Sequence, residues 1–171
     1  MSHKKVQTAR LSIISNSFLI LLKLVVGISG GAVSIISEAI HSTMDLLAAI
    51  IAFFSVKISD KKPDDKHPYG HGKFENISGV IEALLILFAA FWIIYEAVKK
   101  IIKPETSEML GWGFVVMLVS AIINFFVSKR LYKVAKETDS IALEADALHL
   151  KADVYTSLGV ALGLVLIWLT N

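Results

Sequence analysis

Long apolar runs alternate with short polar segments along the whole chain. Five runs are long enough to predict membrane-spanning helices, at residues 11–28, 32–58, 77–102, 109–127 and 140–169. An α-helix rises ~1.5 Å per residue, so about 20 apolar residues cross a hydrocarbon core of ~30 Å. The pattern therefore predicts an all-α fold: a polytopic transmembrane helix bundle of five spans that forms one domain over residues 1–171.

Signals at the ends of these runs indicate how the spans are connected. The first run stops at Ser29-Gly30-Gly31, which predicts a very short connection to the second. The fifth helix is expected to begin at Thr138 or Asp139, because both residue types are good N-caps. The first run is long and lacks a small-residue cleavage pattern, so we expect it to remain as a membrane anchor.

Composition and charge agree with a membrane protein. Hydrophobic residues make up 55% of the 171 residues and charged residues only 19%, with a mean hydropathy of +0.66. The formal charge of +2, without a basic stripe interleaved with aromatics, excludes nucleic acid as the expected partner. Cysteine is absent, so disulfides and thiolate metal ligands are excluded as well.

The distribution of lysine and arginine predicts the orientation. Twelve of them fall before the first run, between the second and third, or between the fourth and fifth. They are Lys4, Lys5, Arg10, Lys57, Lys61, Lys62, Lys66, Lys73, Lys129, Arg130, Lys133 and Lys136. The opposite side has three, Lys99, Lys100 and Lys103. The positive-inside rule therefore places the N-terminus in the cytoplasm and the C-terminus outside.

Two apolar runs carry the same His-x-x-x-Asp pair, His41 with Asp45 and His149 with Asp153. Four residues are about one helical turn, so each pair projects from one helix face. In the predicted topology Asp45 lies ~20 Å and Asp153 ~24 Å below the outer face, so the pairs share a depth. Ionisable groups are costly at that depth, and two His with two Asp suit a tetrahedral zinc shell. The alternative is a structural hydrogen-bond cluster.

The polar segment between the second and third runs holds a second candidate metal site. Asp64, His67 and His71 are spaced three and four residues apart. Pro68 disfavours helix at His67 and the nearby glycines allow tight turns, so these side chains are expected in a folded loop. Spacing alone leaves a plain solvated loop as the alternative.

Three segments together resemble the cation diffusion facilitator family of divalent-metal/proton antiporters, also called the zinc transporter family. They run from Gly31 to Asp45, across His67-Pro-Tyr-Gly-His71-Gly-Lys73-Phe-Glu75, and from Glu144 to Ser157. The resemblance implies that the four membrane residues form the transport site, that the loop residues bind metal, and that the protein is a homodimer. It also implies six membrane helices and a C-terminal cytoplasmic domain. This sequence ends after five runs, so we expect either a short member or a fragment.

We therefore predict an integral protein of a bacterial or archaeal cytoplasmic membrane that exports zinc in exchange for protons by alternating access. His rather than Asp at position 41 resembles the zinc-selective members of the family, whereas members with carboxylate-rich sites take harder ions such as Mn²⁺. No enzyme is expected, because the sequence has no His-Glu-x-x-His motif. The alternatives are a metal-binding membrane protein that does not transport, or a truncated fragment of a transporter.

Overall fold

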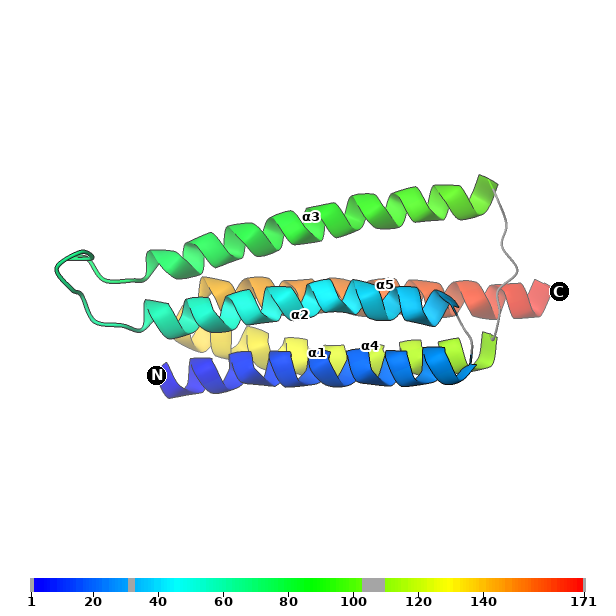
Figure 1. The fold of residues 1–171 in the computed structure, drawn as a ribbon, viewed down its shortest axis with the longest axis horizontal. Helices are drawn as coiled ribbons and strands as arrows, with labels where there is room; N and C mark the ends of the chain where they lie inside the picture. Colours follow the sequence, from blue (N-terminus) through cyan, green and yellow to red (C-terminus); the bar gives the residue numbers. More distant parts are fainter. Residues whose placement is uncertain (1, 31–32, 103–109, 171) are drawn as a thin grey trace.

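Five long helices run side by side along the long axis of the molecule (Figure 1). The computed structural model describes residues 2–30, 33–102 and 110–170. The helices are α1 (Ser2–Gly30), α2 (Val33–Ser59), α3 (Lys73–Ile102), α4 (Leu110–Thr138) and α5 (Ile141–Thr170). The start of α1, the segment 60–72 and the α4–α5 turn share one end, which we call the loop end.

The prediction of an all-α membrane helix bundle is confirmed. Over their described residues, four helices are long and apolar enough to cross a membrane. These candidate spans are His3–Gly30, Glu38–Ser59, Lys73–Tyr95 and Gly113–Thr138. The fifth helix, α5, is as long as α3 but carries four charged residues in its first half, Glu144, Asp146, Lys151 and Asp153.

Three helices begin or end nearer the loop end than the apolar runs indicated. α3 begins at Lys73 rather than at 77, and two others extend further still. α1 begins at Ser2 rather than at 11, and α4 ends at Thr138 rather than at 127. An ion pair between Lys4 and Glu137 joins these two polar extensions. Apolar runs report only the part of a helix at hydrocarbon depth, so paired polar turns beyond it escape a hydropathy reading.

The turn between α4 and α5 corrects the predicted start of the fifth helix. Asp139 has a φ of +50° and the N–H of Ser140 bonds the carbonyl of Ala135 at 3.0 Å, as in a Schellman motif that ends a helix. Ser140 is the N-cap instead, because its carbonyl accepts the first helical bond from Glu144 at 3.1 Å. Thr138 still belongs to α4 and bonds back to Val134.

Packing within the bundle brings α5 into contact with three neighbours. α1 packs on α2 and α4, whereas α5 packs on α4, α3 and α2. α3 approaches α5 closely at Gly79, where an added Cβ would lie 2.9 Å from Cγ2 of Ile141. The apolar core nearest the loop end includes Val56, Leu131 and Leu143. This arrangement leaves α2 and α5 facing each other along the bundle interior.

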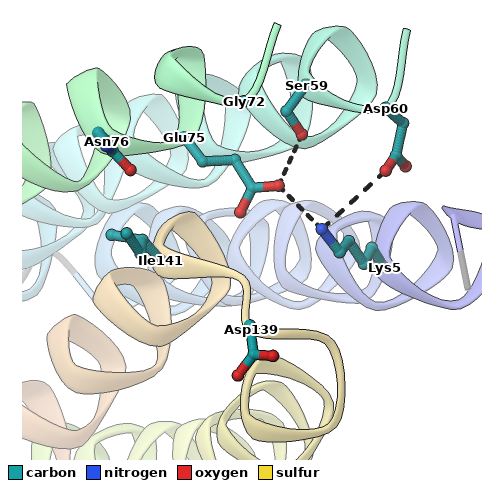
Figure 2. A pocket seen from close by; sticks show the side chains of 8 residues that line it. All are labelled: Lys5, Ser59, Asp60, Gly72, Glu75, Asn76, Asp139 and Ile141. Atoms are coloured by element: carbon teal, nitrogen blue, oxygen red, sulfur yellow. Dashed lines mark hydrogen bonds and ion pairs between the residues drawn. The ribbon is translucent and has the colours of Figure 1, made fainter. Parts of the chain in front are cut away.

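One buried carboxylate ties four segments together at the loop end. Glu75 accepts hydrogen bonds from Lys5 of α1 at 3.0 Å and from Ser59 of α2 at 2.6 Å. Its second oxygen accepts a bond from Ser140, the cap of α5. Figure 2 shows Glu75 pointing between Ser59 and Lys5, with Lys5 also reaching toward Asp60. The surrounding pocket has a volume of about 190 Å³.

We expect Glu75→Ala to destabilise the bundle strongly. The substitution removes the acceptor of the buried Ser140 hydroxyl and leaves Lys5 with Asp60 at 4.0 Å and Ser59 with the carbonyl of Val56. Hydrogen bonds to charged groups contribute about 1.5–3 kcal/mol each. Thermal unfolding of the purified protein in detergent should show a clearly lower midpoint. Glu137→Ala is the matched control, because its Lys4 partner is also on α1 but the pair is exposed and contributes about 0–1 kcal/mol. Equal midpoints for the two variants would contradict this role of Glu75.

Candidate metal centre

The four residues predicted to form a site in the membrane do come together. His41 and Asp45 lie one turn apart on α2, and His149 and Asp153 lie one turn apart on α5. Each helix therefore offers one imidazole and one carboxylate on a single face, and the packing of α2 on α5 joins the two faces. The repeat of one spacing on two helices thus becomes one cluster in the fold.

Distances within this cluster suit ligands of one ion. Nε2 of His149 lies 3.1 Å from Oδ1 of Asp45 and 4.0 Å from Oδ2 of Asp153. His41, Asp45 and Asp153 each offer one ligand atom, and these three atoms lie within 4.8 Å of one another. Asp45 and His149 are buried, and Oδ2 of Asp153 has no hydrogen-bond partner among the described residues. Imidazole nitrogens and carboxylate oxygens are the ligands that Zn²⁺ accepts in tetrahedral sites.

Polar residues of α1 approach the same cluster. The amide of Asn16 lies 3.5 Å from the backbone carbonyl of Asp45. Lys23 is buried beside the cluster and bonds Ser42 at 2.6 Å and Glu38 at 3.1 Å. The sequence assigned no role to Lys23 or Glu38. Together they close the side of the cluster away from the loop end with an ion pair.

The second predicted cluster forms in the loop between α2 and α3. Oδ1 of Asp64 lies 3.0 Å from Nδ1 of His67, and Oδ2 lies 3.4 Å from Nε2 of His71. The imidazole rings of the two histidines are 4.3 Å apart between centroids. Asp64 and His67 also exchange backbone hydrogen bonds, and Gly70 closes the turn with a φ of +83°, which favours glycine. The loop is therefore folded around these three side chains.

Asp64 is held in its charged form. The side-chain hydrogen bond from His67, with backbone hydrogen bonds from His67 and Lys66, keeps its pKa below the usual value although burial opposes this effect. His71 is buried, and its Nδ1 has no hydrogen-bond partner in the part of the chain that the structure describes, whereas Asp64 is largely exposed. A carboxylate and two imidazoles that already face one another can offer three ligands to a divalent ion that arrives from water.

Two buried acids were missed or left undecided by the sequence. From the sequence, Asp146 is equally consistent with lining the cytoplasmic mouth of the site, because it lies three residues before His149, and with a solvated interfacial position; in the structure it is completely buried. Glu82, on α3, was not singled out and is completely buried too. The available signal was an acid in the middle of an apolar run, together with Ser78 one turn earlier.

Comparisons with known proteins place the geometry in a family. A family model described as the cation efflux transmembrane domain matches residues 9–171. An uncharacterized transporter of Methanocaldococcus jannaschii is 36% identical over 91% of this chain and 55% of its own length. The magnetosome protein MamB of Magnetospira sp. is 32% identical over 82% of this chain and 48% of its own length. The manganese efflux system protein MneP of Bacillus subtilis is 30% identical over 96% of this chain and 55% of its own length. The chain spans about half the length of these curated relatives.

We expect the two clusters to bind divalent ions independently. Asp45→Asn should abolish one class of zinc site and Asp64→Asn the other, because the two clusters share no residue and independent sites are additive. Calorimetric titration of the purified protein with Zn²⁺ measures both classes. Asp65→Asn is the control, since it removes an exposed carboxylate next to Asp64 that is outside both clusters. Loss of both classes in either single variant would contradict independence.

Proposed function

We propose that this chain, which belongs to the cation efflux family, is the membrane part of a divalent metal cation transporter. The observation that carries the proposal is the convergence of His41, Asp45, His149 and Asp153 from two helices in the bundle interior. Buried ionisable residues in membrane helices usually mark an ion pathway. The transported ion is the substrate of this site, and the lipid bilayer surrounds the bundle.

Charge balance supports exchange of the metal for protons. Two neutral imidazoles and two carboxylates bring the charge of a bound Zn²⁺ to zero. Without the ion, two carboxylates share a space of low dielectric, which favours protonation of the cluster. Binding of the metal must release those protons, because ligands bind in their deprotonated forms. Nε2 of His149 now contacts Asp45, so the metal must also replace that contact.

Zinc is the ion that we propose. Two imidazole nitrogens make the site softer than an all-carboxylate site, and this favours Zn²⁺ over Mn²⁺. Two Bacillus subtilis relatives are named as manganese efflux system proteins, and the ion proposed here differs from theirs. We assign the difference to position 41.

The proposal also includes the direction of transport and the oligomeric state. The positive-inside rule places the loop end in the cytoplasm, so the Asp64, His67 and His71 cluster faces the source of the exported ion. Alternating access would open the four-residue site first to the cytoplasm and then outside, and inward proton flow would drive zinc out. We propose that the protein is a homodimer in a bacterial or archaeal cytoplasmic membrane. The relatives are about twice as long as the segment that matches this chain.

We expect Asp153→Asn to abolish zinc-dependent proton movement in proteoliposomes. The variant keeps the shape of the side chain but loses a charge that the ion requires. Zinc-sensitive and pH-sensitive dyes inside the vesicles measure both fluxes under an imposed pH gradient. Asp65→Asn is the control, because its carboxylate is exposed and lies outside both clusters and outside the pocket around Glu75. Zinc binding without flux in the unmodified protein would favour the non-transporting alternative.

We expect His41→Asp to shift transport from Zn²⁺ toward Mn²⁺. The substitution replaces a nitrogen ligand by an oxygen ligand and makes the site harder. The ratio of zinc to manganese flux in the same vesicles should fall by roughly tenfold, equivalent to about 1.4 kcal/mol. His3→Asp is the control, since His3 is an exposed residue in the first turns of α1. An unchanged ratio would overturn the assignment of selectivity to position 41.

A further inference from the structure

Two buried acids between α3 and α5 have no lysine or arginine partner among the described residues. Glu82 and Asp146 are both completely buried. The two helices pack closely beside them: Gly79, three residues before Glu82, lies against Ala145, the neighbour of Asp146, with 4.0 Å between an added Cβ and that of Ala145. Both oxygens of Asp146 and Oε2 of Glu82 lack a hydrogen-bond partner in the described part of the chain. The hydroxyl of Ser78 donates to Oε1 of Glu82 at 3.2 Å, the one hydrogen bond to the pair that meets distance and angle limits among the described residues.

The charged groups that face the pair belong to the metal site. His149 of α5 interacts with both acids, and Asp45 of α2 interacts with Asp146. α1 contributes the buried hydroxyl of Ser12 near Asp146, and α4 contributes no charged group to either acid among the described residues. The two buried lysines nearby, Lys5 and Lys23, are bound to other carboxylates.

Two carboxylates that interact in a buried, apolar environment cannot both stay ionised. Burying an unpaired ionised carboxylate costs several kcal/mol. Two neighbouring carboxylates reduce this cost when one of them binds a proton. A bound proton, unlike a bound metal ion or water molecule, requires no cavity between the two side chains. The complete burial of both groups is therefore compatible with a shared proton. Glu82 is the better holder of this proton, because Asp146 lies one turn from the imidazole of His149 on the same helix.

The pair also lies between the metal site and the pocket at the loop end. On α5, Asp146 comes three residues before His149, toward the loop end. On α3, Glu75, Ser78 and Glu82 are spaced three and four residues apart, so they lie on one face of the helix. Glu75 lines the pocket of about 190 Å³ shown in Figure 2. Polar residues of α5 and α3 thus follow one another along the bundle from His149 toward the pocket at the loop end.

We propose that Glu82 and Asp146 form a proton relay between the metal site and the loop end, an inference that rests on the proposed metal/proton exchange. When a metal ion displaces a proton from the four-residue site, that proton adds to a carboxylate oxygen of the pair. A proton then leaves Glu82 through the hydroxyl of Ser78 to water in the loop-end pocket. The pair carries one proton before and after, so the relay changes the rate of proton release and not its amount.

The test is rapid mixing of the metal-free protein with Zn²⁺ in weakly buffered detergent solution containing a pH indicator. Glu82→Gln should slow proton release by roughly tenfold or more, because an amide cannot take up and give back a proton. The number of protons released per bound ion should stay that of the unmodified protein. Glu82→Asp keeps an acid at the position and should restore much of the rate. Glu144→Gln is the matched control, since Glu144 bonds the exposed Lys136.

The outcomes separate the relay from the proposed function. An unchanged rate in Glu82→Gln, with zinc still bound, would overturn the relay and leave the pair as a structural contact. Zinc binding without any proton release in the unmodified protein would instead overturn the proposed exchange. A second measurement avoids the variant altogether: infrared spectra of the unmodified protein with ¹³C-labelled glutamate carboxyl groups. A labelled band of a protonated carboxyl group is expected with and without metal, and its absence in both states would also overturn the relay.

Discussion

The contact between His149 and Asp45 joins two helices that are far apart in the sequence, and the geometry of the interior depends on it. Carboxylates and imidazoles in an apolar bundle are costly unless they meet a partner. The 3.1 Å contact gives each of them one, and it brings Asp153 and His41 into the same cluster. A bound metal ion would replace this contact by binding both side chains. The same residues therefore stabilise the metal-free bundle and provide the metal site.

The sequence predicted those features of the molecule that depend on the residues of a single helix. Each His-x-x-x-Asp pair lies within one turn, so its face follows from helical periodicity, and five apolar runs were enough for five helices. The loop cluster followed from three residues within one short segment. The structure brings both predicted sets of side chains together, while metal binding at either stays a prediction.

Contacts between side chains of different helices could not be predicted from the periodicity of the sequence. Glu82 becomes notable only because Asp146 lies opposite it, and Lys23 only because Glu38 and Ser42 meet it. The start of α5 moved to Ser140 because Asp139 takes the left-handed conformation that ends α4, a choice made by tertiary packing around Glu75. Local propensity could not distinguish three consecutive residues that are all able to cap a helix.

The order of charges along the bundle follows from these pairings. Lys5 with Glu75 closes the loop end and Lys23 with Glu38 closes the other side of the metal cluster. Between these two ion pairs lie four inward acids, Asp45, Glu82, Asp146 and Asp153, with imidazoles but no inward lysine or arginine among the described residues. In the exchange that we propose, a bound divalent ion would balance Asp45 and Asp153, and one proton would balance Glu82. The remaining acid, Asp146, then faces the ligand His149. Among the described residues, lysine supplies inward positive charge only at the two ends of this region, so the charge balance in the middle depends on the imidazoles and on the cations that we propose to bind there.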